Sequence, residues 1–223
     1  MNSKIQSKIC VSIAEAKAEE CIKAIAEVEF AEIRIDKIDN PTTEQVKKIF
    51  SAHKNLIATC RAGSLRDEER KMLLMAAIDS GAVFVDVEVE APENHIKEIV
   101  EHARKKKIGV ILSFHDQKKT PPKAELDEIV KWCFESGADI AKVACMVNSN
   151  KDNVRLLSLL DGEGKVIVIG MGHLGTITRI IAPILGSPFT FAKLKRGKET
   201  ALGQLEKETL ERRMKMLEEV GNE

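Results

Sequence analysis

Short apolar segments rich in Val, Ile and Ala alternate with longer amphipathic segments along the whole chain. Short runs with β-branched side chains are typical of buried parallel strands. The segments between them space their apolar residues three or four positions apart, as amphipathic helices do. Eight strands are predicted, at residues 8–13, 30–35, 56–60, 83–89, 108–113, 139–144, 165–170 and 188–192.

Punctuating residues indicate where the helices begin and end. Thr42 precedes Gln45 by three positions, the spacing of a capping box that opens a helix. Gly81 and Gly137 follow amphipathic stretches at the position where a helix stops. The last predicted helix, over residues 204–220, has Leu210, Met214 and Leu217 on one face.

Eight strand–helix units in succession, with no strand pair joined as a hairpin, predict a (β/α)8 TIM barrel in a single domain over residues 1–223. A doubly wound open sheet is the alternative. That fold usually has a glycine-rich first turn, and residues 12–15 contain no glycine. The pattern therefore favours the barrel.

Composition narrows the classes of protein. The 223 residues include 35 basic and 35 acidic side chains, a balance that argues against nucleic acid or an anionic membrane surface as partner. No apolar run is long enough for a transmembrane helix, and residues 1–6 lack the apolar core of a signal peptide. Five cysteines in no close pairing pattern indicate a reducing compartment, so a cytoplasmic protein is expected.

Active sites of such barrels lie at the carboxyl ends of the strands, and polar side chains gather there in this sequence. Because successive side chains of a strand point to opposite faces, Glu32, Arg34 and Asp36 of the second predicted strand share one face. From the first strand to the seventh, the polar residues are Ser12; Glu32, Arg34 and Asp36; Thr59 and Arg61; Asp86 and Glu88; Ser113 and His115; Lys142; and His173.

Lys142 stands inside the apolar run of the sixth predicted strand. Burial and nearby cations lower the pKa of a lysine amine, and an unprotonated amine attacks a carbonyl to form an imine. The alternative is a barrel-wall lysine that pairs with a carboxylate such as Glu32 or Glu88. The residues alone leave both interpretations open.

His115 follows the fifth predicted strand, one strand before Lys142, with Ser113 on the same face. Its ordinary pKa suits proton transfer near neutral pH, although a lone histidine is more often structural. His53, His95 and His102 are predicted to lie on the surface, and the role of His173 stays undecided.

Arg34, Arg61 and Arg179 would bring three guanidinium groups to one mouth, where arginine binds carboxylates bidentately. The alternative is an internal network of salt bridges. Gly170, Gly172 and Gly175 could instead cradle a phosphate, a weak signal. Cys60 and Cys145 lack partners at the spacing of metal ligands, so no metal is expected and both are predicted to be buried apolar residues.

Several segments resemble the type I 3-dehydroquinate dehydratases, the Schiff-base enzymes of the shikimate pathway. The similarity covers essentially the whole chain, and the segments occur in the family's order at the expected strand ends. They are Glu32-Ile33-Arg34-Ile35-Asp36, Thr59-Cys60-Arg61, Ser113-Phe114-His115-Asp116 with Thr120-Pro121, Asp139-Ile140-Ala141-Lys142, Met171-Gly172 with Thr178-Arg179, 187–191, and Ala201-Leu202-Gly203-Gln204.

The resemblance implies reversible dehydration of 3-dehydroquinate to 3-dehydroshikimate by a homodimer without metal or organic cofactor. It makes Lys142 the imine-forming lysine and His115 the general acid and base of a syn elimination. Arg179 would hold the substrate carboxylate with help from a loop, 193–203, that we expect to be mobile without ligand. The other residues to which it assigns substrate contacts are Ser12, Glu32, Arg34, Arg61, Met171, Phe191, Thr200 and Gln204.

Leu65 departs from the family pattern. Many members have a glutamate four residues after the T-x-R arginine, where it supports the catalytic histidine. Either Glu68 or Glu69 takes its place here, or another group orients His115. Leu202 also stands where the family has a proline. Two rival functions remain: another lysine-imine barrel, such as an aldolase of sugar phosphates, and a non-catalytic ligand-binding barrel.

Overall fold

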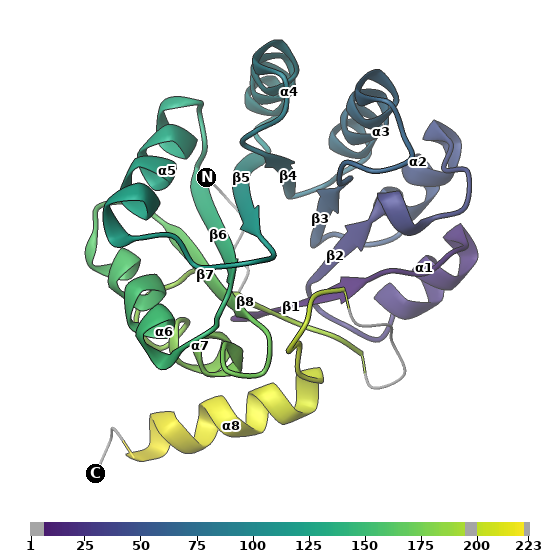
Figure 1. The fold of residues 1–223 in the computed structure, drawn as a ribbon. Coiled ribbons are helices and arrows are strands. Elements are labelled where there is room, and N and C mark those ends of the chain that lie inside the picture. Colours follow the sequence, from purple (N-terminus) through teal and green to yellow (C-terminus); the bar gives the residue numbers. More distant parts are fainter. Residues whose placement is uncertain (1–6, 195–199, 221–223) are drawn as a thin grey trace.

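The computed structural model describes residues 7–194 and 200–220. Eight parallel strands lie side by side in the order β7-β6-β5-β4-β3-β2-β1-β8, with helices outside them (Figure 1). The strands are β1 (Ile9–Ile13), β2 (Ala31–Arg34), β3 (Leu56–Thr59), β4 (Phe84–Glu88), β5 (Gly109–Asp116), β6 (Ile140–Met146), β7 (Val166–Met171) and β8 (Thr190–Ala192).

All eight predicted strands are present, and their sequential parallel order confirms the TIM barrel over the doubly wound sheet. Within the described residues hydrogen-bonded ladders join every neighbouring pair except β7 and β8, so the barrel is nearly closed. The helices are α1 (Ala18–Ile25), α2 (Thr43–Ser51), α3 (Asp67–Asp79), α4 (Glu93–Lys106), α5 (Lys123–Glu135), α6 (Asn150–Leu157), α7 (Thr176–Ile181) and α8 (Lys207–Val220).

Local sequence signals explain several boundaries. The capping box of Thr42 and Gln45 opens α2 as predicted. Gly81 and Gly137 follow α3 and α5 with φ angles of 105° and 99°, a conformation that glycine adopts without a steric penalty. Strand β5 extends to Asp116 rather than ending at Ser113, so His115 lies on the strand itself.

Alternate strands fill the lower part of the barrel. Cys10 of β1, Ile57 of β3, Ile111 of β5 and Ile167 of β7 are fully buried in one cluster. Side chains from odd-numbered strands meet in this way only inside a barrel, where each layer takes residues from every second strand. The even-numbered strands are thereby free to contribute the next layer, which contains Lys142.

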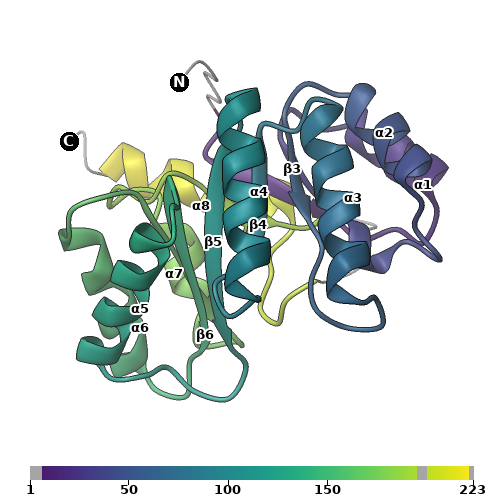
Figure 2. The ribbon, with the colours of Figure 1, turned by 90° about the horizontal axis from the view of Figure 1, so that it is seen from above.

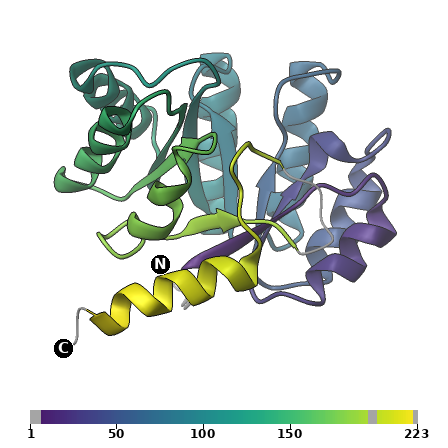
Figure 3. The ribbon, with the colours of Figure 1, turned by 60° about the horizontal axis from the view of Figure 1, so that its bottom comes forward.

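Helix α8 lies outside the strands and packs against α7 and β1 (Figures 2 and 3). Leu210 and Met214 are buried against Ile9 and Ala192, as the sequence predicts. Leu217 belongs to the same helix face but is 43% exposed, unlike Leu210 and Met214. The prediction was wrong for the start of the helix, which begins at Lys207 because Gln204 remains in the preceding loop.

Gly175 allows β7 and α7 to touch. A Cβ atom on Gly175 would lie 2.4 Å from the carbonyl carbon of Gly170. We therefore expect Gly175→Ala to lower the free energy of unfolding by about 2–3 kcal/mol, since backbone atoms must move to admit the methyl group. Thermal unfolding measures this change. Gly63→Ala is the control, because nothing lies within 4 Å of its Cβ position; equal stability of the two variants would contradict the packing argument.

Candidate active site

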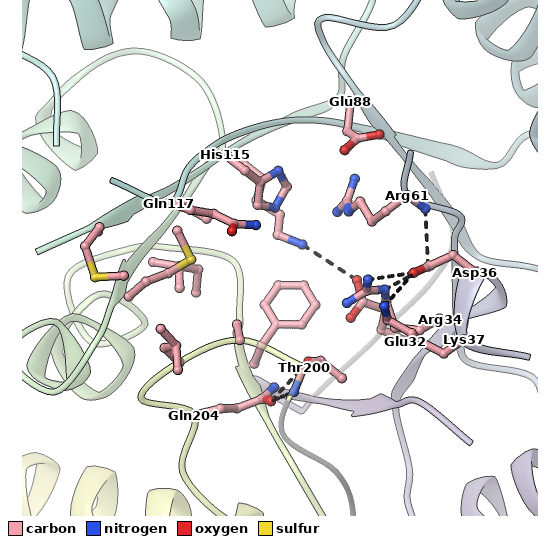
Figure 4. Close-up of a pocket in the computed structure, with 18 of the residues that line it drawn as sticks. Glu32, Arg34, Asp36, Lys37, Arg61, Glu88, His115, Gln117, Thr200 and Gln204 are labelled. Atoms are coloured by element: carbon pink, nitrogen blue, oxygen red, sulfur yellow. Dashed lines mark hydrogen bonds and ion pairs between the residues drawn. The ribbon is translucent and has the colours of Figure 1, made fainter. Parts of the chain in front are cut away.

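A cavity of about 500 Å³ opens at the carboxyl ends of the strands (Figure 4). Every predicted site residue lines it except Ser12, which donates a hydrogen bond to the lining residue Glu32. The lining residues are Glu32, Arg34, Asp36, Lys37, Arg61, Ala62, Glu88, His115, Gln117, Lys142, Ala144, Met146, Ile169, Met171, Arg179, Phe191, Thr200, Ala201, Leu202 and Gln204.

Lys142 lies at the centre of the barrel and meets side chains from all three other even-numbered strands. Its Nζ donates to Asp86 Oδ2 of β4 at 2.9 Å and lies 3.7 Å from Glu32 Oε1 of β2. It also lies 4.1 Å from the centre of the Phe191 ring of β8. Lys142 therefore lies in the barrel interior and also pairs with carboxylates, as the alternative interpretation of the sequence proposed. Glu88 is not the partner, because Asp86 makes the direct bond.

Sequence analysis placed Asp86 among the polar residues at the strand ends but assigned it no role in the site. Asp86 is fully buried and accepts from Lys142, Arg61 and Ser113. Burial by itself would raise the pKa of its carboxyl, but the charges of Arg61 and Lys142 outweigh burial and hold that pKa well below its usual range. Asp86 is therefore a permanent anion between two cations. Its position between Val85 and Val87 in β4 was the available signal.

Glu32 is held at the base of the cavity by neutral donors. Ser12 Oγ donates to one carboxylate oxygen, and Thr59 Oγ1 donates to the other at 2.9 Å. Thr200 Oγ1 in turn donates to Ser12 Oγ at 3.0 Å, so the loop after β8 is tied to the start of the barrel. Ser12 thus acts on the cavity through Glu32 rather than by lining it.

Arg34 and Arg61 occupy the wall formed by β2 and β3. Arg34 forms a bidentate salt bridge with Asp36, with contacts of 2.9 and 2.8 Å. Arg61 reaches inward and donates from Nη1 to Ser113 Oγ at 2.8 Å, at the same distance from Asp86 Oδ1. The internal salt-bridge network weighed from sequence is therefore present for these two arginines.

His115 lines the same cavity as Lys142, and Figure 4 shows its ring turned into that cavity. Its Nδ1 is buried without a hydrogen-bond partner among the described residues. Burial, followed by the cations Arg61 and Lys142, holds the pKa of the imidazole well below its ordinary value of 6.5. At neutral pH the ring is therefore uncharged and able to accept a proton.

Arg179 and Gln204 form the opposite side of the cavity. Arg179 is 1% exposed, and its guanidinium lies 3.4 Å from the carbonyl oxygens of Phe191 and Leu202. Gln204 donates to the carbonyl of Ala192 at 3.0 Å and accepts from the backbone N–H of Thr200. The predicted loop 193–203 includes residues 195–199, which lie outside the described residues.

The glycines of β7 and its following loop serve packing rather than phosphate binding. Besides the contact between Gly170 and Gly175, a Cβ on Gly203 would lie 2.5 Å from the carbonyl oxygen of Gly172. Helix α7, which follows, is short. The weak phosphate signal in the sequence is thus accounted for by close backbone contacts.

Neither glutamate proposed in place of the one absent at Leu65 reaches His115. Glu68 bonds His95 and Lys71, Glu69 bonds Arg66, and Leu65 packs on the apolar core. The prediction that His95 is a surface residue was wrong, because the Glu68 carboxylate bonds its ring in a buried position.

The remaining histidines and the cysteines lie away from the chemistry. His53 is partly buried against the carbonyl of Val28, and His102 lies beside Asp79 on the surface. His173 is exposed and does not line the cavity. All five cysteines are free and buried, as predicted for Cys60 and Cys145, and burial raises the pKa of those two thiols to about 12.

The structure thus defines a TIM-barrel protein with an interior lysine and a neutral histidine facing one cavity. The model of the family described as type I 3-dehydroquinase matches residues 9–220. The 3-dehydroquinate dehydratase of Methanocaldococcus jannaschii is 37% identical over 215 residues, which are 91% of this chain and 95% of that protein. The enzyme of the same name from Methanothermobacter thermautotrophicus is 36% identical, covering 91% and 93%.

Solved structures agree with these sequence relatives. The type I 3-dehydroquinate dehydratase of Clostridium difficile, solved with covalently modified comenic acid, superposes with a TM-score of 0.85 at 27% identity, covering 96% of this chain and 93% of that one. A 3-hexulose-6-phosphate synthase superposes with a TM-score of 0.60 at 16% identity, which shows the shared fold alone. The chain belongs to the type I 3-dehydroquinase family and is a hydro-lyase. No helix within residues 7–194 and 200–220 is both long and apolar enough to cross a membrane.

Proposed function

We propose that this protein converts 3-dehydroquinate to 3-dehydroshikimate reversibly through an imine on Lys142. The observation that carries the proposal is the amine of Lys142, which is held inside the barrel by Asp86 and Glu32 and shares one cavity with the imidazole of His115. We infer the substrate from the family match and the order of the chemical steps from the site residues.

Lys142 adds to the C3 ketone of the substrate as the unprotonated amine, and loss of water gives an imine. When protonated, the imine is an electron sink that acidifies the neighbouring C2–H. Asp86 and Glu32 stabilise the positive charge of the protonated imine, since both carboxylates lie beside the nitrogen. Hydrolysis after the elimination releases the product and restores the amine.

His115 moves the protons. Its neutral imidazole takes the C2 proton and then returns a proton to the C1 hydroxyl, which leaves as water. One histidine serves both steps if both groups lie on the same face of the ring, which corresponds to a syn elimination. General acid and base catalysis of this kind contributes roughly 10²–10⁴-fold to the rate.

The cavity walls suit a small hydroxylated carboxylic acid. Arg179 and Gln204 are assigned to the substrate carboxylate, and Arg34, Arg61 and Glu32 to the ring hydroxyls, with Thr200 and Ser12 supporting them. Met171 and Phe191 supply apolar contact to the ring. Close backbone contacts account for Gly170 and Gly175, so these glycines do not by themselves support the phosphate site that an aldolase of sugar phosphates requires.

Turnover of 3-dehydroquinate, followed by the ultraviolet absorbance of the conjugated enone product, tests the function. We expect saturable formation of the product without added metal or cofactor. A sugar phosphate cleaved in its place would support the aldolase, and binding of 3-dehydroquinate without turnover would support the ligand-binding barrel.

A further inference from the structure

Three consecutive residues at the end of β3 are each fixed by a charged side chain from a different element. The carbonyl of Cys60 accepts from Arg70 Nε of α3 at 3.0 Å. The N–H of Arg61 donates to Asp36 Oδ1 at 3.2 Å, and the N–H of Ala62 donates to Glu88 Oε2 at 3.1 Å. Loop backbone normally bonds to water or to its own neighbours, so three such contacts in a row fix this short stretch strongly.

Arg70 links two of these three contacts. Its Nη2 donates to Glu88 Oε2 at 2.6 Å, the same oxygen that accepts from Ala62. Its Nη1 binds Asp67 Oδ1 at 2.9 Å. Arg70 is only 7% exposed, so its planar group spans the ends of β3 and β4 from a buried position. A lysine has one nitrogen and cannot make these three contacts together.

The residue held by this clamp reaches the reacting groups. The Arg61 guanidinium bonds Ser113 and lies 2.8 Å from Asp86, and Asp86 in turn holds the amine of Lys142. Figure 4 shows Arg61 between the Glu88 carboxylate and the His115 ring, with its backbone tied to Asp36. A displacement of the Arg61 backbone would therefore be transmitted to Asp86 and to the surroundings of both His115 and Lys142.

We propose that Arg70 is a positioning residue: through Cys60 and Glu88 it fixes the backbone of Arg61, and through Arg61 it sets the arrangement of Asp86, His115 and Lys142. The role rests on the proposed function. It explains why a charged side chain outside the cavity is buried. Among the described residues, Nδ1 of His115 has no hydrogen-bond partner of its own.

Arg70→Met tests the proposal. We expect kcat/KM to fall about 10- to 100-fold, mainly through kcat, because small displacements of catalytic groups have effects of this size. Arg70→Lys should recover part of the loss. Arg66→Met is the matched control, since it removes the same charge from an 82% exposed side chain at the start of the same helix and should leave kcat/KM unchanged.

A second readout does not depend on turnover. The charged groups that act on His115 are Arg61, Lys142 and Arg34, which lower the pKa of the imidazole, and Asp86, which raises it. If Arg61 moves away in Arg70→Met, an NMR titration should show the pKa of His115 rising toward 6.5. The double variant Arg70→Met/Glu88→Gln should show the same rise in the pKa of His115. This result would show that the rise comes from the movement of Arg61 and not from the Glu88 carboxylate that Arg70 no longer neutralises.

A folded Arg70→Met variant with wild-type kcat/KM and an unchanged His115 titration would overturn the proposal. Lower thermal stability with both readouts unchanged would show a structural role only, and would overturn it equally. If Arg70→Met does not fold, wild-type values of both readouts in Arg70→Lys decide against it. A wild-type protein without dehydratase activity would refute the proposed function, while the titration would still report on Arg70.

Discussion

Replacing Lys142 with methionine should lower turnover of 3-dehydroquinate by at least about 10³-fold, equivalent to about 4 kcal/mol of transition-state stabilisation. The substitution keeps the length and apolar stem of the side chain but removes the nucleophile. The fold should survive, because Asp86 keeps its contacts with Arg61 and Ser113, and Glu32 keeps those with Ser12 and Thr59. Steady-state kinetics and thermal unfolding measure the two effects separately.

Borohydride identifies the nucleophile directly. Reduction of an imine fixes the ligand to the chain as a secondary amine, so the wild-type protein should lose activity to borohydride only when substrate or product is present. The added mass should map to the peptide that contains Lys142, and Lys142→Met should not be labelled. Lys37→Met is the control, because Lys37 lines the same cavity but pairs with Asp36. In this variant borohydride should still label Lys142.

Two results would contradict the imine mechanism. Labelling at a lysine other than Lys142 would assign the nucleophile elsewhere. An active enzyme that borohydride never inactivates in the presence of substrate would remove the imine altogether. Labelling of Lys142 with a sugar phosphate but not with 3-dehydroquinate would support imine formation on Lys142 but would indicate that the protein is an aldolase.

The alternation of apolar and amphipathic segments was sufficient to predict the architecture, because each strand of a parallel barrel is buried on both faces. Boundaries were less predictable where tertiary contacts decide them. Gln204 could begin a helix by its local pattern, but its amide bonds the carbonyl of Ala192 and the N–H of Thr200, which holds it in the loop. Leu217 follows the helical period yet is 43% exposed.

The site was predictable where one residue type has a clear chemical use. A lysine within an apolar strand and a histidine at the end of the preceding strand stand out in a sequence. Asp86 did not, because an aspartate in a strand acquires meaning only from the partners it meets, and its partners Arg61 and Lys142 come from other strands. The buried position of Arg70 could not be predicted for the same reason, since nothing in the sequence of its own helix distinguishes it from surface arginines.

Pairing of ionised groups was the least predictable feature. The sequence predicted that Arg34 and Arg61 lie at the mouth of the barrel. It did not indicate whether they bind the substrate or form salt bridges with carboxylates of the protein. In the structure Arg34 is saturated by Asp36 and Arg61 by Asp86 and Ser113. Arg179 lines the same cavity, and its guanidinium can bind a carboxylate in bidentate fashion.

Replacing His115 with alanine should lower turnover by about 10²–10⁴-fold while imine formation continues. The two effects separate because the Lys142 amine forms the covalent bond, whereas His115 transfers the protons of the elimination. The fold should tolerate the change, since Nδ1 of the ring has no hydrogen-bond partner among the described residues and its removal leaves no donor or acceptor unpaired there. Turnover and borohydride labelling are measured on the same preparation.

His173→Ala is the matched control for this experiment, because His173 is exposed and lies outside the cavity lining, so turnover should stay at the wild-type value. In His115→Ala, borohydride with substrate should still label the peptide that contains Lys142. Residual turnover above a few per cent of wild type would show that another group moves the protons. Loss of labelling together with turnover would show that His115 is needed to form the imine, and the division of roles between the two residues would have to be redrawn.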